Sequence, residues 1–255
     1  MKPEEWKRLA SGVTDRMKEY TRPCVTAMRT SNQYGVHLLG TGSYVTAKGR
    51  RLLTTCEHVI RAKTAVEHQF WGADQIFQVP DPFVCDQLLD TAFAAIRETA
   101  WNAVEHAAWT IDLREFAPKH QPVDRELLFF RGFAGENARY GFGVHEANAT
   151  GYCSQEPPGP PIAPELFEMR WVPKRIEFTE QTSDEMKAKM LHNDPRGFSG
   201  SLVWNTRFVE LSSAGKAWRP EDAVITGLLC RYIEERETLA ALRVEHLRGW
   251  LEGQV

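Results

Sequence analysis

The chain has 255 residues, of which 42% are hydrophobic and 25% charged, a composition typical of a folded globular protein and unlike that of disordered or fibrous chains. Its formal net charge is −3 with Lys and Arg scattered, which excludes the basic stripe that nucleic-acid-binding proteins use to neutralise phosphates. It has no apolar run of signal-peptide or membrane-spanning length, so we expect no membrane span and a cytoplasmic location.

The first element is a predicted helix over residues 1–22. Apolar side chains recur every three or four positions from Trp6 to Tyr20, and Pro23 ends the pattern. Short runs of β-prone residues follow, separated by Gly, Ser, Asn and Lys. We expect strands at 24–28, 35–39, 43–47, 52–55, 76–79, 92–96, 127–133, 144–152, 166–172, 175–179, 201–204 and 224–232.

The chain after residue 152 contains a proline-rich segment and a second helical pattern. Prolines at 157, 158, 160, 161 and 164 cannot donate the hydrogen bonds of a sheet interior and predict a surface loop. From Glu234 to Val255 apolar residues return at helical spacing, so we expect a C-terminal helix. The strands do not alternate with helices, which favours an all-β body flanked by two terminal helices over a parallel α/β sheet.

Three stretches each place one reactive residue at the edge of an apolar β run. His58 lies in GTGSYVTAKGRRLLTTCEHVI (40–60), Asp90 in LLDTAFAAI (88–96) and Ser199 in PRGFSGSLVWN (195–205). A serine hydroxyl is a weak nucleophile, so it needs an imidazole to take its proton and a carboxylate to hold the imidazole in the right tautomer. Each of these residues alone can be explained by a structural role, but the order of the three residues and the strands beside them favour a catalytic role.

These stretches resemble the signature segments of trypsin-like serine peptidases, and they are most similar to those of the bacterial HtrA/Deg-type branch. The resemblance implies two six-stranded antiparallel β-barrels of the chymotrypsin type, the first over 23–118 with His58 and Asp90 and the second over 119–233 with Ser199. It also implies an oxyanion hole made by the backbone N–H groups of Gly197 and Ser199. Helices at 1–22 and 234–255 complete one peptidase domain. The PDZ module is common in that branch, but we expect none here because the chain ends soon after the last predicted helix.

The resemblance implies a substrate-binding region as well. Asn193 is expected at the base of the pocket for the side chain before the cleaved bond, and Cys230, Arg231 and Tyr232 are expected along the substrate-binding strand. Two alternatives stay open for the substrate residue: Arg231 favours an acidic one, or Asp194 favours a basic one, unless these side chains point into solvent.

The remaining polar residues predict no cofactor. The five cysteines are widely spaced and lack a CxxC pair, so we expect free thiols, with Cys56 packing beside His58 rather than acting as a nucleophile. The histidines lack ligand spacing, which predicts no metal site.

The sequence therefore predicts a serine endopeptidase that acts on protein or peptide substrates. Because such an enzyme in the cytoplasm would be harmful if always active, we expect control by a regulatory protein partner, an oligomer or an inactive resting geometry of 197–199. Two alternatives remain: a protease-like binding or scaffold protein without activity, and a partner-activated effector of a bacterial stress or antiviral system.

Overall fold

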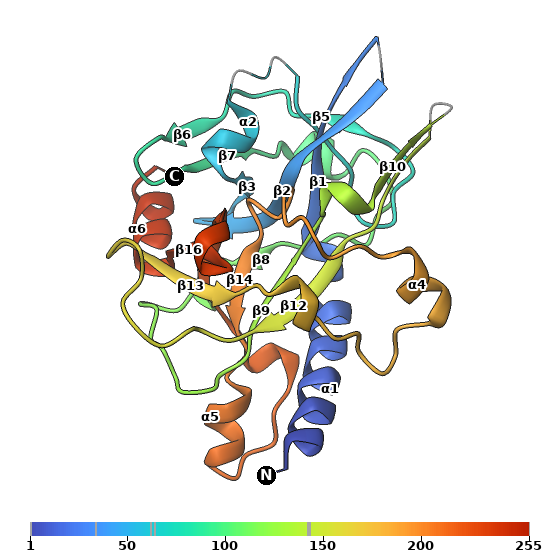
Figure 1. Ribbon diagram of the computed structural model, residues 1–255. Helices are drawn as coiled ribbons and strands as arrows, with labels where there is room; N and C mark the ends of the chain where they lie inside the picture. Colours follow the sequence, from blue (N-terminus) through green and yellow to red (C-terminus); the bar gives the residue numbers. More distant parts are fainter. Residues whose placement is uncertain (1, 34, 62, 64, 142–143, 255) are drawn as a thin grey trace.

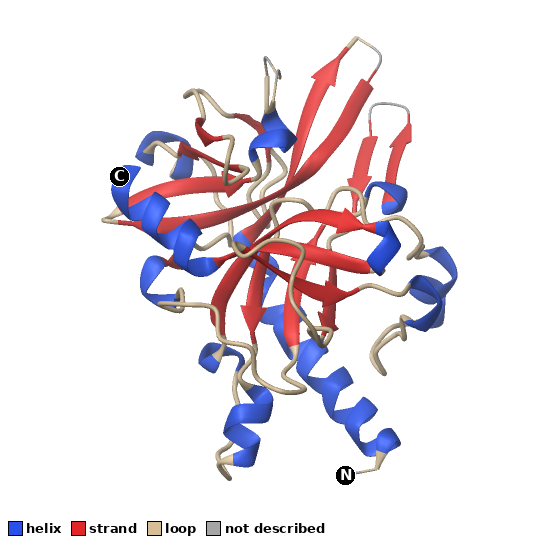
Figure 2. Ribbon diagram, turned by 60° about the vertical axis from the view of Figure 1, so that its left-hand side comes forward, coloured by secondary structure: helices blue, strands red, loops and turns tan. Residues whose placement is uncertain are grey.

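The computed structural model describes residues 2–33, 35–61, 63, 65–141 and 144–254. Two curled β-sheets pack against each other, and helices lie at the periphery (Figures 1 and 2). Within the described residues, no helix has the length and apolar character needed to cross a membrane.

The first barrel holds residues 25–112. Its strands have the order β5-β4-β1-β2-β3-β7-β6, and β8 pairs in parallel with β2 while the other pairs are antiparallel. The strands are β1 (Val25–Asn32), β2 (Gly35–Ala47), β3 (Arg50–Thr55), β4 (Glu67–His68), β5 (Phe77–Gln78), β6 (Val84–Asp86), β7 (Thr91–Ala95) and β8 (Ile111–Asp112). Short helices α2 (Glu57–Ile60) and α3 (Glu98–Trp101) connect strands of this barrel, and the 3-10 turn η2 (Leu113–Glu115) follows β8.

The second barrel is a six-stranded antiparallel sheet with the order β12-β9-β14-β15-β16-β13. Its strands are β9 (Leu128–Gly132), β12 (Thr150–Ser154), β13 (Leu166–Arg170), β14 (Leu202–Asn205), β15 (Val224–Ile233) and β16 (Thr238–Arg243). A separate hairpin of β10 (Ala138–Gly141) and β11 (Val144–Ala147) projects beside the β1–β2 hairpin (Figure 1).

The remaining helices lie outside the sheets. They are α1 (Pro3–Thr21), α4 (Asp184–Lys189), α5 (Phe208–Ser213) and α6 (Val244–Gln254), with 3-10 turns η1 (Arg22–Cys24), η3 (Gly135–Asn137), η4 (Pro173–Arg175), η5 (Pro220–Asp222) and η6 (Glu234–Arg236). Helix α1 contacts β9 and β12, where the buried Arg131 donates to the carbonyl of Lys18 at 2.7 Å. The predicted N-terminal helix is therefore present and covers the second barrel.

The Gly-Thr-Gly segment lies inside a strand rather than in a turn. The predicted strands at 35–39 and 43–47 are the two halves of β2. A Cβ atom on Gly40 would lie 2.8 Å from the side chain of Val59, and one on Gly42 would lie 2.6 Å from Met28 Sδ. The glycines are therefore needed for close packing within the first barrel.

The predicted helix from Glu234 is wrong over its first half. Residues 238–243 form β16, which pairs with β13 and β15, and α6 begins only at Val244. Thr238 to Leu242 are all buried, so this strand shows no period of two, and a short fully buried strand cannot be told from a helix by periodicity. The second barrel therefore extends past 233 to Arg243.

The strand predicted at 175–179 is also wrong. Pro173 starts the 3-10 turn η4 there, and an irregular segment continues to Thr182. The proline-rich segment is a surface loop, as predicted: Pro158 and Pro160 are exposed and lie outside any strand.

Candidate active site

His58 lies on α2, directly after β3, and faces the turn that leads into β7. Asp86 accepts hydrogen bonds from the backbone N–H groups of Leu88 and Leu89 and so fixes this turn. At its end, Asp90 has the left-handed φ of 52°, which an Asp tolerates better than most residues. The conformation turns the carboxylate of Asp90 toward the start of α2.

The carboxylate of Asp90 binds His58 through two groups. Its Oδ2 atom lies 2.7 Å from Nδ1 of His58, and its Oδ1 atom accepts the backbone N–H of His58 at 3.0 Å. The side chain of His58 is 39% exposed and that of Asp90 20%. With Nδ1–H donated to Asp90, the lone pair of Nε2 stays available to accept a proton.

Ser199 lies in a turn that both barrels hold. Thr41 of β2 donates its N–H to the carbonyl of Ser199 at 2.9 Å and its hydroxyl to the carbonyl of Gly197 at 2.8 Å. From the second barrel, the carbonyl of Leu229 accepts the N–H of Gly200 at 2.8 Å. The serine therefore sits at the junction of the two barrels.

The turn depends on the glycine that precedes the serine. Gly197 has a φ of +105°, and a Cβ atom there would lie 2.3 Å from the carbonyl oxygen of Phe133. Gly135 donates its N–H to the carbonyl of Arg196 at 2.8 Å. In a trans peptide bond the C=O and the following N–H point in opposite directions. The peptide bonds of the described residues are trans, so the N–H of Gly197 points away from Gly135 when the carbonyl of Arg196 points toward it. Among the described residues, the N–H groups of Gly197 and Ser199 have no acceptor, as anion-binding donors require.

The hydroxyl of Ser199 does not bind His58 in this structure. Its Oγ atom donates to the carbonyl of Cys230 on β15 at 3.2 Å, and no hydrogen bond between Ser199 and His58 occurs among the described residues. The structure thus joins His58 to Asp90 and points the predicted nucleophile toward the strand predicted to bind substrate.

Two buried cysteines lie behind this site. Cys56 donates its thiol to the carbonyl of Leu229 at 3.3 Å, and Cys230 donates to the carbonyl of Ala240 at 3.3 Å. Burial raises the pKa of Cys230 to about 11 and that of Cys56 well above its usual range. Both thiols are free, like the other three, which agrees with the predicted packing role of Cys56.

The predicted substrate-binding residues lie on the two segments that flank Ser199. Asn193 is exposed on the segment that precedes the serine, and Arg231 is exposed on β15 after the buried Cys230, while Tyr232 is partly buried. The carboxylate of Asp194 pairs with Arg196 at 2.6 Å, which lowers the pKa of Asp194. This ion pair weakens the argument that Asp194 selects a basic substrate residue.

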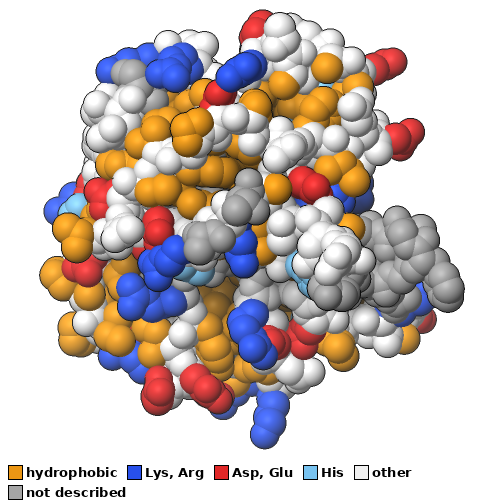
Figure 3. Space-filling view, turned by 90° about the horizontal axis from the view of Figure 1, so that it is seen from above, with side chains coloured by type: hydrophobic (Ala, Val, Ile, Leu, Met, Phe, Trp, Pro, Cys, Tyr) orange, Lys and Arg blue, Asp and Glu red, His pale blue; other side chains and the backbone are white. Residues whose placement is uncertain are grey.

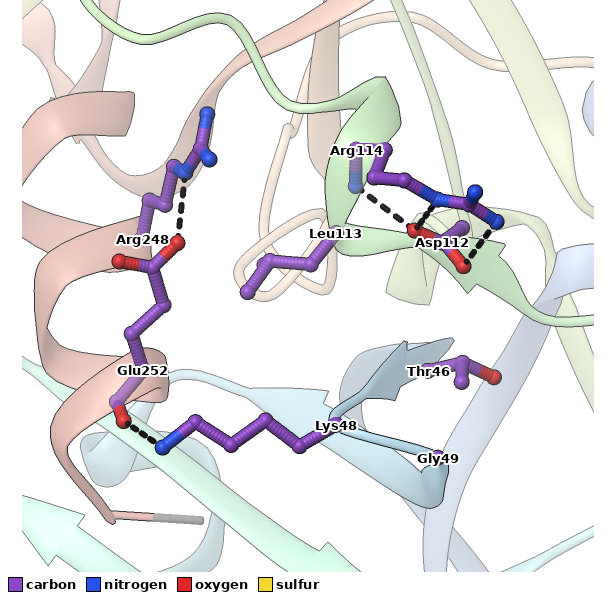
Figure 4. A pocket seen from close by; sticks show the side chains of 8 residues that line it. All are labelled: Thr46, Lys48, Gly49, Asp112, Leu113, Arg114, Arg248 and Glu252. Carbon is purple, nitrogen blue, oxygen red and sulfur yellow. Dashed lines mark hydrogen bonds and ion pairs between the residues drawn. The ribbon is translucent and has the colours of Figure 1, made fainter.

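Seen from above, hydrophobic side chains cover much of the surface between scattered Lys and Arg side chains (Figure 3). A separate pocket of about 570 Å³ does not include the predicted site residues. Its charged side chains are paired with each other or with backbone, as Arg248 is with Glu252 (Figure 4). The pocket is lined by Thr46, Lys48, Gly49, Asp112, Leu113, Arg114, Arg248 and Glu252.

Sequence reasoning missed two residues that position the site. Thr41 binds the serine turn, and Gly135 fixes the peptide before Gly197. Thr41 could have been found from its place between two glycines in the motif. Gly135 carries no such signal, because only the fold brings η3 beside residue 196.

No family model and no curated protein matches the sequence. Solved structures do match, and those compared below are proteases. The active form of the Rv3671c protease from M. tuberculosis is similar over 94% of this chain and 85% of its own, with a TM-score of 0.54 and 16% identity. The serine endoprotease from Yersinia pestis is similar over 94% of this chain and 67% of its own, with a TM-score of 0.52 and 12% identity. At these identities the likeness shows the fold, so the predicted double β-barrel of the chymotrypsin type is confirmed.

Proposed function

We propose that this protein is a serine endopeptidase that cleaves polypeptides through an acyl-enzyme intermediate. His58 acts as general base, Asp90 orients it and Ser199 attacks the peptide carbonyl. The observation that carries this proposal is the pairing of the Asp90 carboxylate with Nδ1 of His58 at 2.7 Å, in a fold shared with serine proteases. The pairing leaves Nε2 free to take the serine proton.

The first chemical step follows from this arrangement. Ser199 attacks the carbonyl carbon while its proton moves to Nε2 of His58, and the negative charge of Asp90 stabilises the imidazolium that forms. The N–H groups of Gly197 and Ser199 then bind the oxyanion, and losing one such donor typically costs about 2.7–4 kcal/mol of transition-state stabilisation. His58 returns its proton to the leaving amine, and the acyl group stays on Ser199 as an ester. Water then attacks this ester while His58 takes a proton from the water and returns it to the oxygen of Ser199.

Ser199 must rotate before it can react. Its hydroxyl has to leave the carbonyl of Cys230, which sacrifices one hydrogen bond worth about 0.5–1.5 kcal/mol. A peptide bound along β15 that donates an N–H to this carbonyl would release the hydroxyl toward His58. The resting geometry thus supports an enzyme switched on by substrate or by a regulatory partner, and it is also the observation that favours the alternative of a silent protease-like scaffold.

Cleavage profiling with matched variants tests the proposal. The wild-type protein, Ser199→Ala and Ser212→Ala are incubated with a denatured proteome, and new peptide termini are identified by mass spectrometry. Ser212 is exposed on α5 and serves as the control. We expect the same termini from the wild type and Ser212→Ala and none of them from Ser199→Ala. Termini that persist in Ser199→Ala would contradict the proposal.

A further inference from the structure

Three side chains of the types that bind metal ions lie close together in the candidate site. The Sγ atom of Cys56, a ring nitrogen of His58 and a carboxylate oxygen of Asp90 all lie within 4.8 Å of one another. Thiolate, imidazole and carboxylate are the ligand types of zinc sites, and a soft sulfur ligand favours Zn²⁺ over Mg²⁺ or Ca²⁺. The sequence does not reveal this set, because Asp90 reaches the other two only through the fold.

We propose that Cys56, His58 and Asp90 form a zinc-binding site that inhibits the protein. Each residue supplies one ligand, with Nδ1 as the ligand atom of His58, and a water molecule completes a tetrahedron. The inhibition rests on the proposed function, whereas the binding does not.

The geometry requires only small movements. With metal–ligand distances of about 2.0–2.3 Å, two ligand atoms on one tetrahedral ion lie about 3.3–3.6 Å apart. The Nδ1–Oδ2 distance of 2.7 Å must therefore open by less than an ångström. The Sγ atom of Cys56 lies within 4.8 Å of a ring nitrogen of His58 and of a carboxylate oxygen of Asp90, so it must approach them by up to about 1.3 Å. The partly exposed side chains of His58 and Asp90 leave the ion a path from solvent.

Binding changes the protons of two ligands. The thiol of Cys56 gives its proton to solvent, while neutral His58 loses its proton at Nδ1 and gains one at Nε2, so that one proton is released in total. The buried thiol also gives up its hydrogen bond to Leu229, which makes binding weaker than at a preformed structural site.

The inhibition follows from the tautomer of His58. Zinc at Nδ1 forces the neutral imidazole to carry its proton at Nε2, where no lone pair remains to accept the proton of Ser199. Asp90 is occupied by the metal at the same time. Bound zinc and an activated serine therefore exclude each other.

Zinc titration calorimetry on the Ser199→Ala protein tests binding apart from catalysis. We expect one Zn²⁺ per chain, release of one proton measured from buffers of different ionisation enthalpy, and a thiolate-to-metal absorption band when Co²⁺ replaces zinc. Adding Cys56→Ser should weaken binding by at least about 100-fold, more than the loss of an outer hydrogen-bond partner usually does. Adding Cys85→Ala, which removes an exposed thiol in the same barrel, should leave binding unchanged.

The variants also distinguish the outcomes. Cys56→Ser keeps a hydroxyl that can donate to Leu229, and its thermal unfolding midpoint checks that it folds. Any of three results would overturn the proposed site: zinc binding that Cys56→Ser leaves unchanged, loss of zinc binding in Cys85→Ala, or no zinc binding up to millimolar zinc. If the site binds zinc but the wild-type protein never reacts with a fluorophosphonate, the proposed function fails and the metal site stands.

Discussion

Replacing Gly197 by Ala tests how the structure prepares the oxyanion donors. At a φ of +105°, an Ala residue is strained by about 1–3 kcal/mol. Its Cβ atom would lie 2.3 Å from the carbonyl oxygen of Phe133 and 3.0 Å from the nitrogen of Gly135, so the backbone must shift. The shift breaks the hydrogen bond from Gly135 to Arg196, a further loss of about 0.5–1.5 kcal/mol.

We expect Gly197→Ala to lower the free energy of unfolding by roughly 2–4 kcal/mol. For a domain of this size, that corresponds to a fall in the thermal midpoint of roughly 5–15 °C. The moved N–H of residue 197 should also reduce the rate of peptide cleavage by about 10²–10³. Urea unfolding and initial rates on a cleaved peptide measure the two effects.

Gly215→Ala is the matched control. Gly215 has a φ of +68°, but no heavy atom lies within 4 Å of an added Cβ, so only the conformational strain of about 1–2 kcal/mol applies. Its cleavage rate should equal that of the wild type. If the folded Gly197→Ala protein cleaved at the wild-type rate, the assignment of this N–H as an oxyanion donor would be refuted.

Substitutions at Asp90, His68 and Glu126 test the histidine tautomer, a buried imidazole and a helix cap. Asp90→Asn should lower the cleavage rate by about 10⁴ with little loss of folding, because the amide holds His58 in the wrong tautomer; activity near the wild-type level would exclude the assigned role. Burial lowers the pKa of His68 to about 4. Below about pH 6.5 the unfolded chain therefore binds more protons than the folded protein, and the free energy of unfolding falls as the pH drops toward 4. Between pH 7 and pH 5 the free energy of unfolding should fall by about 2 kcal/mol. Urea unfolding at both pH values should show that loss for the wild type and a smaller one for His68→Gln. The buried carboxylate of Glu126 accepts hydrogen bonds from the N–H groups of Val209 and Glu210 at the start of α5. Glu126→Ala should therefore lower the free energy of unfolding by at least about 2 kcal/mol. A decrease of less than about 0.5 kcal/mol would contradict this capping role.

The short strands predicted a β-barrel or sandwich, and the resemblance of the three motifs to those of trypsin-like peptidases implied the double barrel. The sequence did not predict strand β16. Thr238 to Leu242 are buried on both faces of that strand, so the residues lack the alternation of period two that marks a half-buried strand and resemble a helical segment. The long β2 strand was divided in two because Gly40 and Gly42 are usual turn residues, whereas here they serve close packing.

The pairing of His58 with Asp90 follows from the motifs, but the orientation of Ser199 does not. A hydroxyl rotamer depends on competing acceptors, and the carbonyl of Cys230 becomes one only when β15 reaches the serine turn. The contact from Gly135 to residue 196 and the approach of Cys56 to Asp90 likewise depend on tertiary structure. Such contacts between distant segments have no periodic or spacing signal.

In the proposed mechanism, Ser199 becomes a nucleophile because His58 takes its proton. The most direct measurement is covalent labelling with a fluorophosphonate, followed by intact-mass analysis and mapping of the modified peptide. We expect one adduct per chain on Ser199 in the wild type and none in Ser199→Ala, with labelling slowed by at least about 100-fold in His58→Ala. An adduct on another residue, or equal labelling of the wild type and His58→Ala, would contradict it.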